Sequence, residues 1–405
     1  VPGTEDQIDI VYSVEEETTG SVGGNIGYSD FGLMLGFNLQ EQNFLGSGNT
    51  VGIGINKNIY SEMYNISYMN PYATRDAVSL GYNVFFRETD YGEFNVANYL
   101  TNSNGFGAQF GYPISDISRL GFNITYDKTD IDIGTLPARE IYDFVSVEGN
   151  IFETLTAQLS WQQVTLNRGL FPTDGASTVV SFSSTIPGSD LSYYRFNIRQ
   201  RYYQPLSSDF VFGFQGEIGY LDSYGDTEEI PFFQNFYAGG PRSLRGFESN
   251  TLGPRSTDAP CYEFNYEEGT CPNLIDTDGD GEADAPYLNP YANQGQRSRY
   301  RDAPIGGNIK VEGSLQLIFR LPFIEDQRSL RSAFFFDFGN VFSDNCKEYQ
   351  INCSELSVDE LRYSYGVGVT WITGFGPMSL AIAKPTNAGP LERTEEFQFT
   401  VGNVF

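Results

Sequence analysis

The sequence predicts an all-β fold, a 16-stranded antiparallel transmembrane β-barrel. Three observations favour this fold: a large supply of aromatic residues, alternation of polar and apolar residues over short segments, and the lack of any long apolar run. The 405 residues include 33 Phe, 27 Tyr and 44 Gly, too many aromatic residues for one small soluble core. No apolar run approaches the ~20 residues that a membrane-spanning helix needs. A barrel uses these aromatic residues because alternate positions on every strand face hydrocarbon.

The alternation is clearest at 308–320. Polar residues occupy one set of alternate positions, interrupted only by Ile318, and apolar residues occupy the other. The segments 191–204 and 361–372 repeat the pattern. We expect the polar face to line a wet lumen and the apolar face to contact lipid. In 308–320 the polar set is Asn308, Lys310, Glu312, Ser314, Gln316 and Arg320, and the apolar set is Ile309, Val311, Leu315, Leu317 and Phe319.

Sixteen such strands follow one another along the chain, each about ten residues long, as a tilted span requires. An even number of strands places the start of the first strand and the end of the last strand on the same side of the membrane, the periplasmic side. The strands are expected at 20–29, 31–41, 48–58, 61–70, 77–88, 103–113, 117–129, 148–163, 176–185, 191–204, 208–221, 308–320, 329–340, 361–372, 376–384 and 394–403.

The links between these strands differ in length, and we assign the short ones to the periplasmic side and the long ones to the outside. The link 222–307 is too long for an idle connection, because loops of such length are usually functional or disordered. The short turns are Asn70-Pro71, 113–116 and 187–190, and the long links are 130–147, 222–307 and 341–360.

Charge and the absence of histidine exclude several functions. Asp and Glu outnumber Lys and Arg by 52 to 24, a net charge of −28, whereas nucleic-acid binding needs a basic surface. The acidic loops are either simply solvated or lie beside anionic lipid headgroups bridged by divalent cations. The chain has no His and no nucleophile–base pair, phosphate loop or metal-hydrolase motif. We therefore expect no covalent catalysis, and the protein is not expected to be an enzyme.

The four cysteines form two close pairs in polar, turn-rich stretches, Cys261 with Cys271 and Cys346 with Cys353. Neither pair has the CxxC spacing of zinc or redox sites. We expect two disulfides, and hence an oxidising compartment such as the periplasm or the cell surface.

Carboxylates at alternate positions lie within the long link, at 276–284. Hard oxygen ligands around a glycine turn are typical of calcium loops. However, Tyr287 stands where an EF-hand has its last Glu. A structural calcium site and a solvated acidic loop tip both remain open, and no other cofactor is expected. The candidate ligands are Asp276, Asp278, Asp280 and Asp284.

The long link also contains Phe-Tyr-Ala-Gly-Gly-Pro-Arg-Ser-Leu-Arg-Gly-Phe at 236–247, followed by Leu-Gly-Pro at 252–254. Here the sequence resembles the Omp85 superfamily, whose sixth extracellular loop carries a Val/Ile/Leu-Arg-Gly-Phe/Tyr tip. The segments 171–175, 186–190 and 397–402 are similar to the assembly factors of this family and follow in the same order. The resemblance covers most of the chain.

The resemblance implies that 222–307 folds into the lumen and that Arg245 pairs with acids on the barrel wall. Asp337 matches one of these acids and falls on the lumen face by alternation. Gln316 stands where the family has a second acid, and Glu312 on the same face is a substitute. The alternative is that Arg245 merely solvates a surface loop. The expected loop tip is Leu244, Arg245, Gly246 and Phe247.

Residues 1–18 lack the aromatic-rich outer face of the later strands and end their strand-like run in three glutamates. The resemblance implies that they are the tail of a preceding POTRA domain and that 19–405 form the barrel. The chain opens on Val1-Pro2-Gly3 without a signal peptide, so we expect the targeting segment upstream.

The junction of the first and last strands is expected to be the weakest in the barrel, because glycine in the first strand weakens strand pairing. The alternative is that these glycines make room for packing in the lumen. The resemblance favours a seam that opens laterally, with Gly402 as a kink point. The seam residues are Gly23, Gly24, Ile26, Phe399, Val401 and Gly402.

The resemblance implies a multi-pass protein of the Gram-negative outer membrane that folds and inserts β-barrel proteins there. The implied partners are unfolded outer-membrane protein clients, accessory lipoproteins bound through upstream POTRA domains, and outer-membrane lipid and lipopolysaccharide. A polypeptide secretion channel of the same superfamily, either a two-partner transporter or a TamA-like relative, is the first alternative. A passive porin is the second, and the loop-tip motif counts against it.

Overall fold

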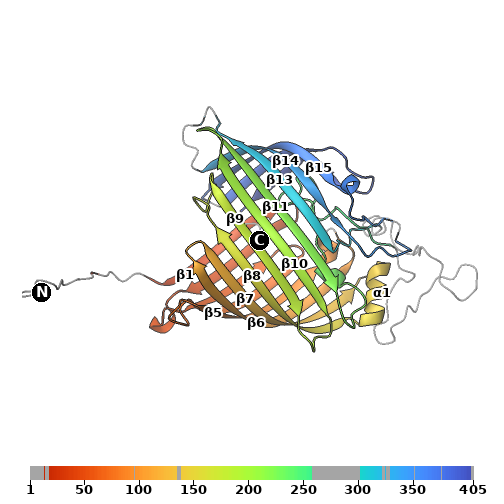
Figure 1. The fold of residues 1–405 in the computed structure, drawn as a ribbon, viewed down its shortest axis with the longest axis horizontal. Helices are drawn as coiled ribbons and strands as arrows, with labels where there is room; N and C mark the ends of the chain where they lie inside the picture. The colour runs from red at the N-terminus through yellow and green to blue at the C-terminus, as the bar shows by residue number, and fades with distance from the viewer. Residues whose placement is uncertain are drawn as a thin grey trace, which may run out of the picture.

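The computed structural model describes residues 13, 18–94, 96–134, 138–257, 302–321, 324, 329–350, 352–374 and 376–402. Within them the chain forms a closed barrel of 16 antiparallel strands, with an α-helix at one mouth (Figure 1). The predicted fold class is therefore confirmed. None of the described helices is long and apolar enough to cross a membrane.

The barrel strands occur in chain order around the wall, and their bounds differ from the predicted ranges by only a few residues. They are β1 (Gly20–Ser29), β2 (Gly32–Glu41), β3 (Thr50–Lys57), β4 (Ser61–Asn70), β5 (Ser79–Asp90), β6 (Tyr99–Ser115), β7 (Ser118–Ile133), β8 (Ile151–Val164), β9 (Gly175–Thr185), β10 (Tyr193–Pro205), β11 (Phe210–Ser223), β13 (Ile309–Phe319), β14 (Leu330–Phe342), β15 (Arg362–Thr373), β16 (Gly376–Pro385) and β18 (Phe397–Val401).

The remaining elements lie in the links. They are the helix α1 (Arg139–Glu148), the short strands β12 (Gly246–Phe247) and β17 (Thr394–Glu395), and the 3-10 turns η1 (Phe44–Gly46), η2 (Tyr91–Phe94), η3 (Phe232–Gln234) and η4 (Val358–Glu360).

The alternation in the sequence becomes the two faces of the barrel wall. Ser314 of β13 is registered with Asp337 of β14, and Asp337 is fully buried on the lumen face. At the next position Leu315 is registered with Phe336, and both side chains are exposed on the outer surface. Apolar side chains are exposed in the same way on many strands, which gives the outer surface the apolar character that contact with lipid requires. They include Val22, Phe37, Ile66, Phe86, Phe106, Phe182, Ile218, Trp371 and Ile382.

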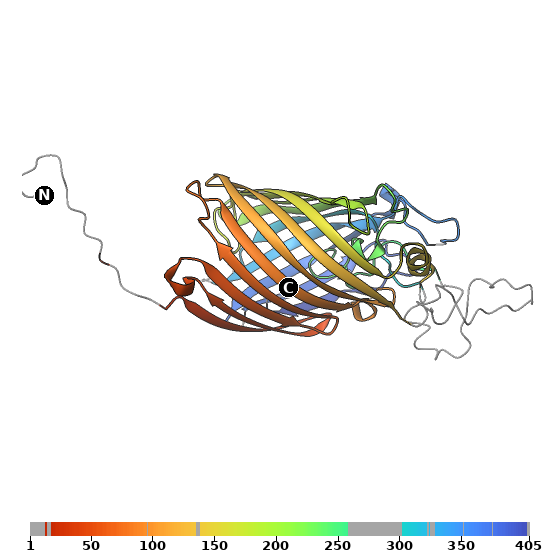
Figure 2. The ribbon, with the colours of Figure 1, turned by 90° about the horizontal axis from the view of Figure 1, so that it is seen from below.

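The barrel has two different ends. We call the end where β1 begins and β2 finishes the turn end, and the opposite end, which carries α1, the loop end (Figures 1 and 2). The turn 186–192 lies at the loop end, because nine strands precede it and β9 finishes there. Hydrogen bonds join Tyr224 N to Ser192 O at 2.9 Å and Ser192 N to Thr227 Oγ1 at 2.8 Å. The prediction that placed 187–190 with the turns of the other side was therefore wrong.

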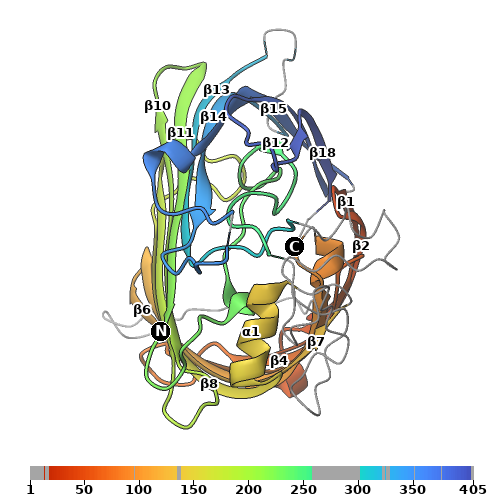
Figure 3. The ribbon, with the colours of Figure 1, turned by 90° about the vertical axis from the view of Figure 1, so that its right-hand side faces the viewer.

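The link after β7, which we treated only as a long connection, contains α1. Its buried residues Ile141, Phe144 and Val145 have helical spacing, which gives the helix one apolar face. The ring of Phe144 packs edge-on against Phe232, with centroids 5.3 Å apart, and at 5.8 Å from Phe152. This packing holds α1 across part of the loop end (Figure 3).

The described parts of the link after β11, residues 224–257 and 302–308, turn inward, and Figure 3 shows β12 inside the outline of the barrel. Their apolar side chains join those of α1 and of neighbouring strand ends in one buried cluster. This link therefore plugs the loop end of the lumen. The largest fully buried members of the cluster are Tyr99, Phe152, Phe247, Ile131, Ile141, Leu191, Leu221, Leu244 and Leu252.

Candidate functional site

The tip of the inward loop reaches the barrel wall through left-handed backbone turns at glycine. Gly239, Gly240 and Gly246 have φ angles of 106°, 97° and 91°, which other residues rarely adopt. A Cβ at Gly246 would lie only 3.2 Å from Ala383 and 3.3 Å from Pro385 of β16. Glycine at this position thus lets the tip approach the wall closely, and there β12 pairs with β17.

Arg245 and Asp337 form a bidentate ion pair inside the lumen. The Nε and Nη2 atoms of Arg245 each donate to one oxygen of Asp337 at 2.7 Å. The backbone N of Arg245 donates to the same carboxylate at 3.2 Å. Asp337 is fully buried, and only 16% of the Arg245 side chain is exposed. Because both charges are largely removed from water, each depends on the other for solvation.

Two further residues surround the guanidinium. Its Nη2 also donates to Ser314 Oγ at 2.9 Å, and its Cζ lies 3.5 Å from the centroid of the Phe335 ring, a cation–π contact. Sequence reasoning missed both residues. The signal that selected Asp337 points to them as well, because Ser314 is registered opposite Asp337 and Phe335 precedes it by two positions on the same face.

The other two residues expected near Arg245 bind elsewhere. Glu312 accepts a hydrogen bond from Ser243 Oγ of the loop. Gln316 donates to Ser314 Oγ at 3.2 Å, so it reaches the guanidinium only through that hydroxyl group. Within the described residues Arg245 is thus paired with a single carboxylate, while Glu312 holds the loop two residues earlier.

Among the described residues, the junction of β1 and β18, the seam, is closed by one registered pair, Tyr28 with Val401. Every other pair of neighbouring barrel strands has five or more registered positions. β1 pairs with β2 over its whole length. On its other edge, residues 20–27 have no strand neighbour in the part of the chain that is described. An edge of this kind can accept another strand.

Gly402 at the end of β18 lies close to β1 across the seam. Its φ angle is 80°, and its N donates to Pro377 O at 2.8 Å. A Cβ at this position would lie 2.5 Å from the carbonyl oxygen of Ile26. The end of β18 therefore turns against β1 at a position that requires glycine.

The other predicted seam residues divide between the two sides. Gly23, Gly24 and Ile26 are registered with β2 only, and Phe399 and Val401 are registered with β16. A Cβ at Gly23 would lie 2.3 Å from Asn38 Oδ1. Gly23 thus makes room for a neighbouring side chain, which agrees with the alternative interpretation of the first-strand glycines.

The loop tip contacts both sides of the seam. On β18, Gln398 Nε2 donates to Phe247 O at 2.8 Å, and Gln398 Oε1 accepts from Gly246 N at 3.3 Å. On the other side, Ser249 Oγ donates to the carboxylate of Asp30 in the turn after β1. A short segment of the loop therefore joins the two strands that pair so little with each other.

Three carboxylates gather where the loop crosses the seam, those of Asp30, Glu248 and Glu395. Burial raises the pKa of the Glu395 carboxyl, and the charges of Asp30 and Glu248 raise it further, whereas a hydrogen bond from Gln398 lowers it. Arg393 pairs with Glu248 at 3.4 Å. Protonation of Glu395 therefore relieves repulsion at the point where the tip bridges the seam.

Several predicted sites lie partly or wholly outside the described residues. Cys346 and Cys353 form a disulfide in the link after β14, whereas Cys261 and Cys271 are not among the described residues. The calcium candidates at 276–284 and most of 1–18 also fall outside them. In the described ranges, no group of three or more His, Cys, Asp or Glu side chains is placed to hold a metal ion.

The family model described as the Omp85 superfamily domain matches residues 43–405. Outer membrane protein assembly factor BamA of Neisseria meningitidis serogroup B is 29% identical over 432 residues, covering 100% of this chain and 49% of that protein. Sorting and assembly machinery component 50 homolog of Mus musculus is 24% identical over 371 residues, covering 89% of this chain and 67% of that protein.

Two solved structures are also similar. BamA from Haemophilus ducreyi lacking POTRA domains 1–3 superposes with a TM-score of 0.79 at 29% identity, covering 99% of this chain and 73% of that chain. CdiB from Escherichia coli superposes with a TM-score of 0.56 at 10% identity, covering 96% and 63%. This second likeness shows the fold alone.

The chain spans about half the length of the curated BamA relative from Neisseria meningitidis. The BamA relatives are named outer membrane protein assembly factors, and the closed barrel with its apolar outer surface agrees with a location in that membrane. The chain is therefore an integral protein of a Gram-negative outer membrane. Because the family model matches most of the sequence, the chain belongs to the Omp85 superfamily.

Proposed function

We propose that this chain is the barrel domain of an assembly factor that folds and inserts other β-barrel proteins into the outer membrane. The observation that carries the proposal is the single registered pair that closes the barrel between β1 and β18. The names of the relatives, outer membrane protein assembly factor and sorting and assembly machinery component, support it. In this proposal residues 19–405 are the barrel and 1–18 are the tail of a preceding POTRA domain.

The seam is the interface of the barrel that opens at the lowest cost, because a backbone hydrogen bond contributes only about 1 kcal/mol net and one registered position holds the seam. Opening frees the edge of β1, whose backbone groups an incoming strand can satisfy by β-augmentation. Closure of the client barrel then satisfies its own backbone groups, and its apolar face enters lipid. In this proposal, opening of the seam, strand pairing and closure of the client barrel involve no covalent step. The protein therefore acts without ATP or a cofactor and is not an enzyme.

The loop tip holds the barrel in a competent state. The ion pair of Arg245 with Asp337 fixes the tip to the wall, and the tip in turn contacts Gln398 and Asp30 on the two sides of the seam. The partners are unfolded outer-membrane protein clients and the BAM accessory lipoproteins, which bind through upstream POTRA domains. Outer-membrane lipid and lipopolysaccharide surround the apolar face.

The test is client folding by the full-length protein with its accessory lipoproteins in liposomes, scored by the heat-modifiable gel shift of a folded barrel. We expect faster folding than in empty liposomes. A Tyr28→Cys/Val401→Cys disulfide locks the one registered pair of the seam and should abolish the gain until it is reduced. The matched control is Ile198→Cys/Ile218→Cys, a registered pair inside the long β10–β11 ladder, which should leave folding unchanged.

Client folding no faster than in empty liposomes would overturn the proposal. Passage of an unfolded polypeptide through the lumen would then favour a secretion channel, and a large steady conductance would favour a passive pore. If folding is accelerated but is insensitive to the seam lock, the seam mechanism is wrong even though the protein is an assembly factor.

A further inference from the structure

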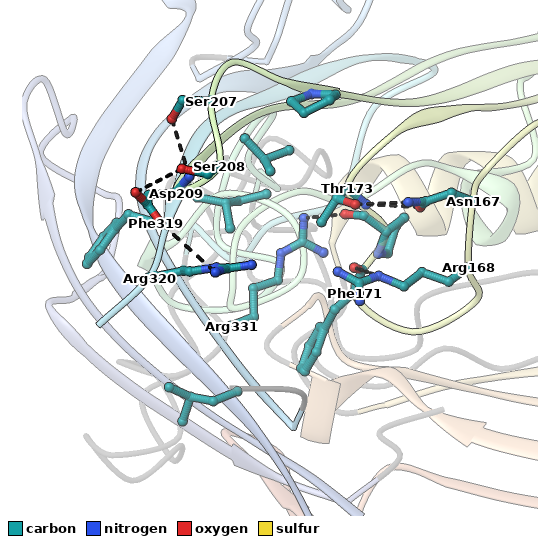
Figure 4. A pocket seen from close by; sticks show the side chains of 15 residues that line it. Asn167, Arg168, Phe171, Thr173, Ser207, Ser208, Asp209, Phe319, Arg320 and Arg331 are labelled. Carbon is teal, nitrogen blue, oxygen red and sulfur yellow. Dashed lines mark hydrogen bonds and ion pairs between the residues drawn. The ribbon is translucent and has the colours of Figure 1, made fainter. Parts of the chain in front are cut away.

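A cavity of about 820 Å³ opens at the turn end of the barrel, and no residue of the loop tip 244–247 lines it. Its walls are the turn 165–174 between β8 and β9, the turn 206–209 between β10 and β11, and the adjacent ends of β13 and β14. Figure 4 shows Arg168, Arg320 and Arg331 directed toward the centre of this space from three different elements.

The floor of the cavity is apolar, although it belongs to the lumen face. Val211 of β11 is registered with both Pro205 of β10 and Ile318 of β13, so these three residues form a row across neighbouring strands. Ile318 is the residue that interrupts the polar face of its strand in the sequence. The row therefore forms a local apolar surface at the mouth of an otherwise polar lumen.

The rim of the cavity is basic, and two of its arginines have no carboxylate partner among the described residues. Arg168 Nε donates to Phe171 O at 2.7 Å. Arg331 Nη2 donates to Pro172 O at 3.3 Å, and its Cζ lies 4.7 Å from the Tyr203 ring centroid. Carbonyl groups and rings leave the positive charge of a guanidinium uncompensated.

The third arginine faces Asp209, the one acid among the described residues that line the cavity. Arg320 lies 4.0 Å from Asp209, and both side chains are well exposed, at 69% and 61%. An exposed pair at this distance contributes little. Among the described residues that line the cavity, three arginines therefore outnumber a single carboxylate, in a chain whose net charge is −28.

The turn that presents Arg168 is held in a defined shape. Asn167 Nδ2 donates to Thr173 Oγ1 at 2.9 Å, and Thr173 N donates to Asn167 Oδ1 at 3.1 Å. Phe171 has a φ angle of 49°, a left-handed conformation that a bulky residue adopts only where the surroundings impose it. This constrained turn places the Phe171 carbonyl where it orients Arg168.

We propose that this cavity binds an acidic segment of an extended polypeptide that enters the barrel from the turn end. A carboxylate can form two parallel hydrogen bonds with one guanidinium, and a neighbouring apolar side chain fits the floor of Val211 and Ile318. This inference rests on the proposed function and names the chemistry that selects client segments, acidic residues beside an apolar one.

The position of the cavity favours a polypeptide over a lipid phosphate. Its floor is on the lumen face, away from the lipid-facing surface. Phe171 and Arg331 also line a second cavity, of about 500 Å³, which extends to Arg245 and to Gln398 of β18. A segment bound at the mouth therefore lies beside a space that leads to the loop tip and to the last strand.

The test measures binding of a short fluorescent peptide with a central Asp-Phe-Asp to the full-length protein in phosphatidylcholine nanodiscs, by fluorescence anisotropy. The matched peptide carries Asn-Phe-Asn. We expect the acidic peptide to bind at least about tenfold more tightly, because two charge-assisted hydrogen bonds are lost with the amides. Arg168→Gln/Arg331→Gln should weaken the acidic peptide by a similar factor. Arg199 is a lumen-facing arginine that pairs with Glu217 outside this cavity, so the control variant Arg199→Gln should leave binding of the acidic peptide unchanged.

Folding of each variant is checked by its heat-modifiable migration. If the double variant does not fold, the single variant Arg320→Gln takes its place, because the Arg320 side chain is exposed. Equal binding of the two peptides, or unchanged binding by the variants, would overturn the proposal. So would displacement of the peptide by phosphatidylglycerol vesicles but not by excess acidic peptide, since the site would then recognise lipid.

Glu325 and Asp326 follow β13 in the sequence and lie outside the described residues. Peptide binding only in a Glu325→Gln/Asp326→Asn variant would overturn the proposal, because the cavity would then serve the chain's own turn. The proposed function is judged separately in liposomes. Peptide binding that depends on Arg168 and Arg331, together with failed client folding, would leave the cavity as a polypeptide site and remove the assembly function.

Discussion

Replacement of Arg245 by Ala should release the loop tip from the barrel wall. The change leaves Asp337 fully buried without its guanidinium partner. Removal of one member of a buried ion pair costs about 3–5 kcal/mol, and the cation–π contact with Phe335 disappears at the same time. The equilibrium between docked and undocked tip should therefore shift by about two to four orders of magnitude.

The assay is cleavage by chymotrypsin after Phe247, whose side chain is fully buried in the docked tip. When opening and closing are faster than cleavage, the rate follows the undocked population. Heat-modifiable migration shows in parallel that the barrel remains folded. Arg199→Ala is the control, because Arg199 pairs with Glu217 while 67% of its side chain is exposed, and such pairs contribute about 0–1 kcal/mol.

Two further variants test whether the Arg245–Asp337 ion pair holds the loop tip. Arg245→Lys keeps the charge but loses the parallel pair of hydrogen bonds, so its cleavage rate should lie between wild type and Arg245→Ala. Arg245→Met/Asp337→Leu removes both charges and should be less exposed to protease than either single replacement, because no unpaired charge stays buried. A double variant that is cleaved as fast as the two single effects combined would refute the ion-pair argument.

Two other replacements test the bridge across the seam. Gln398→Ala leaves a carbonyl and an N–H of the loop tip without their hydrogen-bond partner, which costs about 1–3 kcal/mol. Hydrogen exchange of the β18 amides should therefore accelerate. Thr400→Ala on the same strand is the control and should have little effect on this exchange. Burial raises the pKa of Glu395, so the docked tip binds this proton more tightly than the undocked tip. Docking of the loop tip should therefore strengthen as pH falls and weaken as pH rises through the raised pKa of Glu395. In the chymotrypsin assay Glu395→Gln should remove this pH dependence, whereas the control Glu396→Gln should keep it. A pH dependence that persists in Glu395→Gln would refute its assignment to Glu395.

The alternation of polar and apolar residues was sufficient to predict the barrel, because a wet lumen and a lipid exterior impose opposite demands on adjacent positions. The same parity placed Asp337 on the lumen face, where it meets Arg245. Ser314 and Phe335 share that face by the same parity, but parity alone does not single out uncharged partners of a guanidinium. Polar hydroxyl groups and rings around a guanidinium have no sequence signature apart from their parity.

Features that depend on long-range geometry were not predictable from sequence. The side of 187–190 is an exception, because it could have been predicted by counting the nine strands that precede it; the error arose because its short length suggested a turn of the other end. Glu312 meets Ser243 rather than Arg245 because the path of the loop, which left-handed glycines determine, sets which wall residue each tip residue reaches. The shortness of the seam ladder likewise depends on where β18 ends, and the glycines of β1 did not predict its length.

The anchors of the loop tip are distributed unequally about the seam, and this determines which contact breaks when it opens. Asp337 on β14 and Gln398 on β18 both hold the tip to the same flank of the seam. The bond of Ser249 to Asp30 crosses to the turn after β1. Breaking the buried Arg245–Asp337 ion pair costs more free energy than breaking the Ser249–Asp30 hydrogen bond. The loop tip should therefore remain with β18 while β1 moves away.

Opening of the seam then requires the loss of the Tyr28–Val401 pair and of one side-chain hydrogen bond to a carboxylate, together a few kcal/mol. An energy difference of that size leaves a minor state populated at about 0.1–10%. In the proposed assembly function, a client strand that pairs with the freed edge of β1 needs a binding free energy only larger than this small difference, since a ligand shifts an equilibrium by its differential affinity for the two states. The same anchors keep the loop tip docked against β18, so the lumen stays plugged while the wall is open.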